Sequence, residues 1–149
     1  MENIEKFNAY AAAAFAQLYA SFPEGTKLDC SQIVYGKPLP SNVTNKELAA
    51  QREDPKIQFC GATLRWLMDT GYFRGSHSDG WVQVSGAVLS VKGFEVLATP
   101  EALSRSKAPV GEQLVEIAKQ GPKEGLKDQI GEAMRWIMWA GAKLTIGAS

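Results

Sequence analysis

The sequence predicts one mainly α-helical domain with a small β-hairpin near its middle. Apolar residues recur at steps of three or four through most of the 149 residues, which is the period of one helix face. Directly after Gly71 the pattern changes to aromatic and β-branched residues, which are typical of strands. No repeat or low-complexity linker divides the chain, and folding hides roughly two-thirds of the surface of a chain this long. We therefore expect a single domain over residues 1–149.

The composition is that of a globular protein without net charge. Hydrophobic residues make up 45% of the chain and charged residues 21%, and 16 basic side chains balance 16 acidic ones. This composition argues against a disordered chain and against a strongly polyanion-seeking protein. The uncharged stretch 7–23 follows an acidic start and contains polar side chains, unlike a signal peptide or a membrane span. We expect a cytoplasmic protein that does not bind membranes.

No pattern predicts a metal site, a cofactor or a catalytic centre. Cys30, Cys60 and His77 lack the spacing of zinc ligands, and we expect both thiols to be reduced and buried. Residues 76–79 are of the types found in serine hydrolases, but four neighbours in a hairpin turn mostly point apart and supply no oxyanion hole. Turn formation explains them better, so we expect no enzyme.

An amphipathic helix is predicted over residues 2–22. Pro23 and Gly25 end it, because proline disfavours helical geometry in the residue before it and glycine permits a chain reversal. A short extended piece over residues 27–30 follows, and Pro38 and Pro40 make the next stretch a loop. The apolar face of the helix carries Ile4, Phe7, Ala11, Phe15, Leu18 and Phe22.

Two helices separated by a tight turn are predicted over residues 45–53 and 55–70. Thr44 and Glu47 form a capping box at the start of the first. Asp54 and Pro55 suit the N-cap and first position of the second, which ends at Gly71. The buried side of this second helix carries Phe59, Cys60, Leu64, Leu67 and Met68.

The remaining chain is predicted as a hairpin followed by three helices. Residues 72–74 and 81–84 form the strands around a polar turn, and a short helix with Leu89, Phe94 and Leu97 on one face ends before Thr99. Helices over about 111–120 and 123–146 finish the chain. The last has an apolar stripe made of Leu126, Ile130, Met134, Ile137, Gly141 and Leu144.

Residues 2–98 resemble the winged helix-turn-helix family, with residues 99–149 as a C-terminal helical extension. Residues Thr63–Leu67 followed by Gly71–Phe73 resemble a recognition helix that ends at a glycine and is followed by the first wing strand. Residues Val88–Leu97 resemble the segment after the wing, where a strand leads into a helix. It implies duplex DNA binding, with the third helix in the major groove and the wing on the backbone or in the minor groove. The residues implied to face the groove are Gln58, Thr63 and Arg65, and those implied to meet phosphates are Lys56, Arg74 and His77.

A protein-binding module is the alternative function. Residues 37–75 carry six basic and four acidic side chains, but Asp69 opposes Arg65 and the whole chain is neutral, which disfavours tight DNA binding. Trp136 and Trp139 in the last helix either pack on the core or anchor a homodimer or a protein partner. Small residues at 131 and 140–142 would let another helix approach. The expected interface residues are Trp136, Trp139, Arg135 and Lys143.

Overall fold

The prediction of a mainly helical chain with a small sheet is confirmed. A computed structural model describes residues 2–38, 42–100, 107–120 and 126–147. The helices of this part of the chain are α1 (Glu2–Ser21), α2 (Cys30–Tyr35), α3 (Asn45–Glu53), α4 (Pro55–Asp69), α5 (Val91–Ala98), α6 (Val110–Gln120) and α7 (Lys127–Gly147). The strands are β1 (Thr26–Asp29), β2 (Phe73–His77) and β3 (Gln83–Leu89), with a 3-10 turn at Asp79–Trp81 between β2 and β3.

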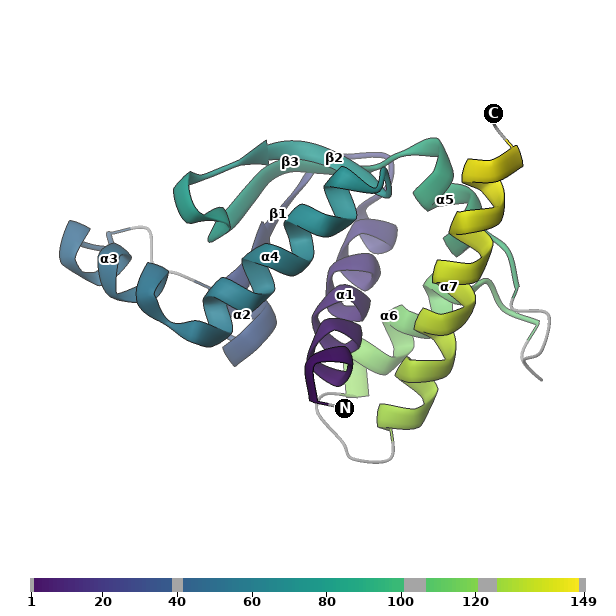
Figure 1. Ribbon diagram of the computed structural model, residues 1–149, viewed down its shortest axis with the longest axis horizontal. Helices are drawn as coiled ribbons and strands as arrows, with labels where there is room; N and C mark the ends of the chain where they lie inside the picture. The colour runs from purple at the N-terminus through teal and green to yellow at the C-terminus, as the bar shows by residue number, and fades with distance from the viewer. Residues whose placement is uncertain (1, 39–41, 101–106, 121–125, 148–149) are drawn as a thin grey trace.

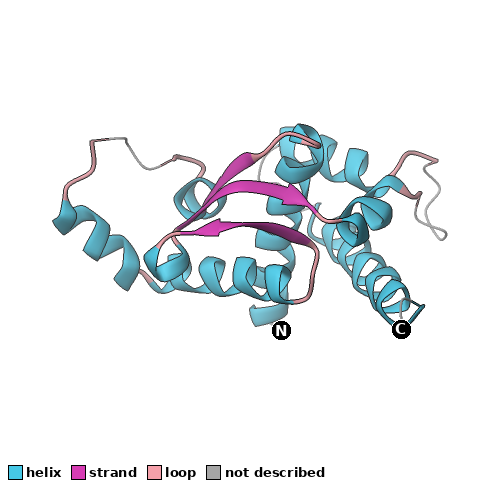
Figure 2. Cartoon of the chain, turned by 90° about the horizontal axis from the view of Figure 1, so that it is seen from above, coloured by secondary structure: helices cyan, strands magenta, loops and turns pink. Residues whose placement is uncertain are grey.

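The sheet contains three antiparallel strands in the order β1-β3-β2, so it is larger than a lone hairpin (Figure 2). Leu28 of β1 and His77 of β2 both lie opposite Val84 of the central strand. Val84 is fully buried, because its side chain points from the sheet into the helices beneath. The short extended piece before residue 30 thus becomes an edge strand of the same sheet.

The core forms around α1, which lies between α4 and α7 and contacts both of them (Figure 1). Phe15 of α1 is fully buried and contacts the ring of Tyr72 edge-on, with 5.6 Å between ring centroids. Leu64 of α4 and Ile137 of α7 are fully buried in the same cluster. The apolar stripes predicted on three separate helices therefore meet in one core.

The helix at residues 30–35 was not predicted, and it packs into the body of the molecule. Asp29 caps α2 by accepting the backbone N–H groups of Ser31 and Gln32, and Cys30 and Ser31 are buried. By contrast, α3 buries no residue and projects from the body of the molecule (Figures 1 and 2). Six residues are too few to display a helical period, which explains why the sequence did not indicate α2.

The last helix packs as its apolar stripe predicts, with Met134, Ile137 and Gly141 buried. Gly141 faces the phenol of Tyr72 so closely that a Cβ atom at this position would overlap it. The expectation that Gly141 offers a surface to another helix is therefore wrong, because its open side is already occupied by Tyr72. No helix in the described ranges combines the length and the apolar character needed to cross a bilayer.

Candidate nucleic-acid interface

The outer side of α4 lies beside the turn that joins β2 and β3. Asp54 begins the helix by accepting the Lys56 N–H at 2.8 Å, with Pro55 at the first helical position. Gly61 lets the turn approach, because a Cβ atom there would lie 3.0 Å from the Cβ atom of Trp81. The hairpin is thereby fixed against the first half of α4.

The residues expected in a DNA groove divide into exposed and buried ones. Gln58 is exposed and its amide donates a hydrogen bond of 2.8 Å to the carbonyl of Arg52. Arg65 is exposed and pairs with Asp69 one helical turn later. Thr63 is only 4% exposed and donates its hydroxyl to the Phe59 carbonyl at 2.9 Å. The expectation for Thr63 is wrong, since its side chain packs inward and is satisfied by its own helix.

The residues expected to meet phosphates are all exposed. The Lys56 Nζ lies 6.0 Å from the centre of the Tyr35 ring. His77 stacks on Trp81 with ring centres 3.9 Å apart and an interplanar angle of 10°. Arg74 is exposed on β2, and no ion pair involves it among the described side chains. Arg74 is therefore free to contact a ligand, whereas the imidazole ring of His77 is held against the Trp81 ring next to the hairpin turn.

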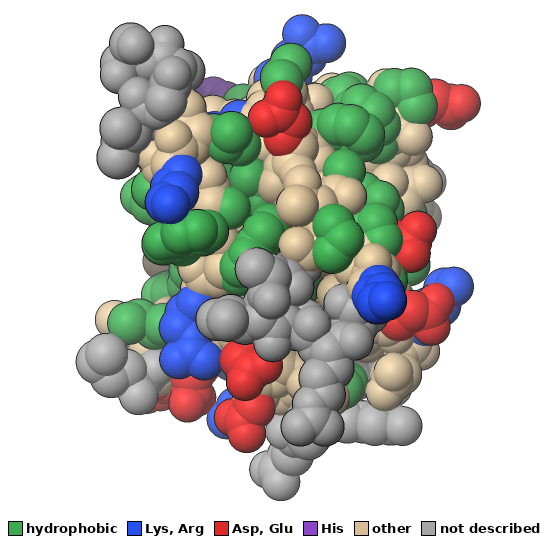
Figure 3. Space-filling model, turned by 90° about the vertical axis from the view of Figure 1, so that its right-hand side faces the viewer, with side chains coloured by type: hydrophobic (Ala, Val, Ile, Leu, Met, Phe, Trp, Pro, Cys, Tyr) green, Lys and Arg blue, Asp and Glu red, His purple; other side chains and the backbone are tan. Residues whose placement is uncertain are grey.

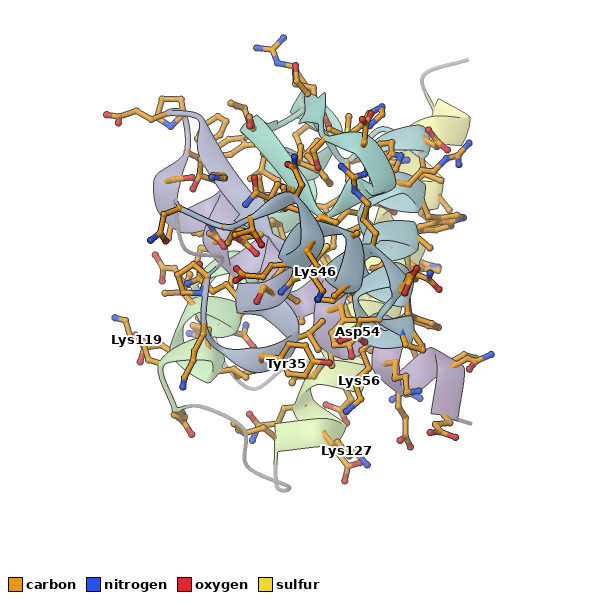
Figure 4. The ribbon with its side chains drawn as sticks, turned by 90° about the vertical axis from the view of Figure 1, so that its left-hand side faces the viewer. Tyr35, Lys46, Asp54, Lys56, Lys119 and Lys127 are labelled. Carbon is orange, nitrogen blue, oxygen red and sulfur yellow. The ribbon has the colours of Figure 1, made fainter. Side chains whose placement is uncertain are left out.

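A hydrogen bond that the sequence did not indicate ties α2 to the start of α4. The Tyr35 hydroxyl donates to Asp54 Oδ2 at 2.5 Å (Figure 4). This bond is the main reason that the pKa of Asp54 lies below its ordinary value, and the same bond raises the pKa of Tyr35. The two residues are 19 positions apart, so no local pattern could have paired them.

The charges on this face are balanced. Residues 45–81, which contain α3, α4 and the hairpin turn, carry five basic and five acidic side chains. Four of these side chains have structural partners nearby: Asp54 is bound by Tyr35, Asp69 pairs with Arg65, and the Arg52 side chain lies 3.3 Å from a Cβ position on Gly80. The face can therefore make a few specific polar contacts but has no broad positive field.

The other exposed side of α4 is apolar and borders a groove of about 420 Å³. Trp66 is 47% exposed there and contacts the ring of Phe7 edge-on, with ring centroids 5.5 Å apart. Met138 of α7 forms the opposite wall. The described residues that line the groove are Phe7, Phe59, Ala62, Thr63, Trp66 and Met138.

The residues expected to form an interface on α7 are not equivalent. Trp136 is half-buried against the core, and its Nε1 is enclosed without an acceptor among the described residues. Trp139 is 56% exposed, and the Lys143 Nζ lies 4.3 Å from the centre of its ring. Arg135 is exposed one turn earlier. The structure thus leaves Trp139, Arg135 and Lys143 on the surface but places Trp136 in the packing of the helix.

The two cysteines are free and fully buried, as the sequence predicts. A hydrogen bond with Cys30, together with burial, raises the pKa of the Cys60 thiol. No group of three or more histidine, cysteine, aspartate or glutamate side chains in the described ranges could hold a metal ion.

At the hairpin turn the Ser78 hydroxyl accepts the Gln83 N–H, and His77 Nδ1 lies 3.1 Å from the Ser78 carbonyl oxygen.

No protein-family model, no curated protein and no solved structure matches the chain.

Proposed function

We propose that the chain is a winged helix-turn-helix protein that binds duplex DNA through the outer side of α4 and the β2–β3 hairpin. One observation carries this proposal: the outer side of α4 is exposed at Gln58, Arg65 and Asp69, and an antiparallel hairpin, fixed against the first half of the helix at Gly61, flanks it (Figure 1). In winged-helix proteins the helix before the wing enters the major groove and the wing contacts the backbone. The sheet order β1-β3-β2 and the helix α1 behind α4 supply the support for this arrangement.

The helix-turn-helix pair in this proposal consists of α2 and α4. Tyr35 at the end of α2 is bonded to Asp54 at the start of α4, so the two helices keep a fixed relation. The helix α3 is an insertion in the connection between them, and it lies next to the hairpin through Arg52 and Gly80.

Specific contacts are assigned to the exposed side chains. Gln58 and Arg65 reach base edges, since amide and guanidinium groups are the usual partners of adenine and guanine. Lys56, Arg74 and His77 contact phosphates, which fix the register of the protein on the duplex. Each neutralised phosphate contributes a slope of about −0.9 to the dependence of log affinity on log salt. Lys56 and Arg74 are the lysine and arginine among these contacts, so with a balanced face we expect modest affinity and a shallow slope of about −2.

The test is a titration of fluorescein-labelled random duplex DNA at about 50 mM and 200 mM salt. We expect Arg65→Ala and Arg74→Ala each to weaken binding by about tenfold, from the loss of a direct contact. Lys119→Ala is the matched control, because Lys119 is exposed on α6 and pairs only with Glu116 among the described residues. Absence of binding at both salt concentrations, or an equal loss with the control, would contradict the proposal.

A protein partner or second copy at α7 is the second candidate function, favoured by the exposed indole of Trp139 between Arg135 and Lys143. Figure 3 looks onto the side that carries α5 and α7, where hydrophobic and charged side chains share the surface. Light scattering of the full chain tests the second-copy version. A dimer that Trp139→Ala converts to a monomer supports it, and a monomer at all accessible concentrations removes it.

A further inference from the structure

Cys30 and Cys60 meet at the point where α2, α4 and the hairpin turn come together. Both side chains are fully buried, and the thiol of Cys60 is hydrogen-bonded to that of Cys30. The Cys30 thiol also donates to the carbonyl oxygen of Trp81, at 3.3 Å. A Cβ atom on Gly61, the residue after Cys60, would lie 3.0 Å from that same oxygen. The packing of three elements therefore holds in contact two thiols that are far apart in the chain.

The carbonyl group that accepts the Cys30 thiol belongs to a residue with an unusual backbone conformation. Trp81 has a φ of 58°, a left-handed value that residues other than glycine keep only where their surroundings hold them. Cys30 supplies two of the hydrogen bonds around it. Its N–H donates to the Val82 carbonyl at 2.9 Å, and its thiol donates to the Trp81 carbonyl. The conformation of the hairpin turn therefore depends on how Cys30 is placed.

We propose that Cys30 and Cys60 form a reversible disulfide that shifts the hairpin turn relative to α4. The bond draws the two sulfur atoms from hydrogen-bond distance to about 2 Å apart. It also removes the proton that the Cys30 thiol donates to the Trp81 carbonyl. Because both sulfur atoms are tightly enclosed, the helices that carry them move with them. Gly61 leaves no space between α4 and Trp81, so this movement reaches the turn.

The oxidant is a low-molecular-weight disulfide of the glutathione type. Reaction begins in a locally opened state, and α2 opens readily because it buries two of its six residues. One cysteine thiolate attacks the small disulfide, whose S–S bond breaks, so that a mixed disulfide and one small thiol form. The other cysteine attacks the mixed disulfide, forms the Cys30–Cys60 bond and releases the second small thiol. Two electrons pass to the oxidant, and both cysteine protons end on the released thiols.

The disulfide itself does not rest on DNA binding, because both cysteines lie in the core. Its effect on DNA binding does rest on the proposed function, since α4 and the hairpin are the surfaces assigned to the duplex. A shift of the turn changes the position of the hairpin residues relative to Arg65 on α4. We therefore expect oxidation to weaken duplex binding about tenfold, a change of the size usual for coupled sites.

The first experiment incubates the protein with excess oxidised glutathione, in urea below the unfolding transition so that local opening is permitted. After return to buffer, non-reducing peptide mapping should show the Cys30 peptide linked to the Cys60 peptide, and dithiothreitol should separate them. The backbone amide NMR signals of Trp81 and Val82 should move on oxidation and return on reduction. Free thiols that persist, or glutathione adducts without the intramolecular bond, overturn the disulfide. An intramolecular disulfide that leaves both signals in place overturns its coupling to the hairpin.

A matched pair of variants tests the role of the Cys30 hydrogen bond without any oxidant. Cys30→Ala removes the donor to Trp81, so its Trp81 and Val82 signals should shift toward those of the oxidised protein. Cys30→Ser keeps a donor and should retain the signals of the reduced protein, and circular dichroism checks that both variants are folded. Equal shifts in the two variants would contradict this role.

The duplex titration is then repeated with reduced and oxidised wild type. Weaker binding of the oxidised form supports the switch, and equal binding of the two forms removes its effect on DNA. If the reduced protein binds no DNA, the proposed function fails, while the peptide map and the NMR signals still decide the disulfide and its coupling to the turn.

Discussion

Arg65 and Asp69 form an ion pair on the outer side of α4, with 3.8 Å between Arg65 Nε and Asp69 Oδ2. Both side chains are about two-thirds exposed, at 66% and 68%, so water competes with the pair and its contribution to folding is small. The pair matters more for binding, because Asp69 places a carboxylate beside the guanidinium that would contact a base.

Asp69→Asn is therefore expected to raise the affinity for duplex DNA by about two- to fivefold, which is the range that an exposed pair of this kind contributes. The amide keeps the shape of the side chain and removes its charge. The measurement is the same anisotropy titration at low salt. An unchanged or lower affinity would show that Arg65 does not contact DNA, whatever the other residues do.

Gly141→Ala is expected to destabilise the protein by about 1–3 kcal/mol, because the added methyl group meets the buried ring of Tyr72. Gly131→Ala on the same helix is the control. Nothing lies within 4 Å of its Cβ position, and the change should stabilise the helix by up to about 1 kcal/mol. Urea denaturation of both variants measures these effects, and a loss of stability in both would refute the steric explanation. In a Tyr72→Phe background the cost of Gly141→Ala should fall.

Tyr35→Phe is expected to raise the pKa of Asp54 back toward its ordinary value of about 3.9, because the hydrogen bond from the phenol is the main cause of its lowering. Titration of the Asp54 side chain by NMR measures this shift directly. Since the Lys56 N–H still bonds to Asp54, the pKa of Asp54 should not return fully to its ordinary value. An Asp54 pKa that does not change in Tyr35→Phe would mean that the bond is not formed in solution.

The same bond should make the stability difference between wild type and Tyr35→Phe depend on pH. In the folded protein the pKa of Asp54 is lowered. Its contribution to the free energy of unfolding is therefore present above the pKa of the unfolded state and is lost as pH falls through the pKa of the folded state. The folded pKa of Tyr35 is raised, so its contribution is present below about pH 10 and is lost as pH rises through the folded pKa. Urea midpoints of the two proteins should differ most near neutral pH and converge at both extremes.

Cys30 and Cys60 are expected to react with a thiol-specific disulfide reagent far more slowly than free cysteine does. Both side chains are fully buried, and the raised pKa of Cys60 leaves little thiolate to attack the reagent. Reaction should follow opening of the structure, so denaturant should accelerate it. Two equivalents of rapid labelling in the native protein would contradict this placement of the thiols.

Local signals predicted the helices well because their causes lie within a few residues. Thr44 and Asp54 each accept a backbone N–H at the start of the helix that follows, as their positions before Glu47 and Pro55 indicate. The stripe on the last helix predicted the burial of Ile137, and of the two alternatives left open for Trp139 the structure shows the exposed one. Capping and helical periodicity depend on spacing along the chain, and spacing is visible in the sequence.

The candidate site was only partly predictable. Arg65 and Arg74 lie on the surface as expected, but Thr63 sits on the edge of the α4 stripe and turns inward. Which way such an edge residue faces depends on where neighbouring helices pack. The apolar groove at Trp66 was likewise invisible, since it exists only because α1, α4 and α7 come together around it.

The sequence by itself therefore determined a mainly helical fold, most helix starts and the apolar stripe of the last helix. The tertiary structure decided that β1 joins the hairpin in one sheet, that α2 rather than α3 packs into the body, and that Tyr35 binds Asp54. It also decided that Gly61 of α4 packs against Trp81 of the hairpin turn, and that Phe59 and Trp66 of α4 line an apolar groove with Met138 of α7. The physical reason is that these features depend on contacts between residues far apart in the chain, whose partners are fixed only when the core assembles.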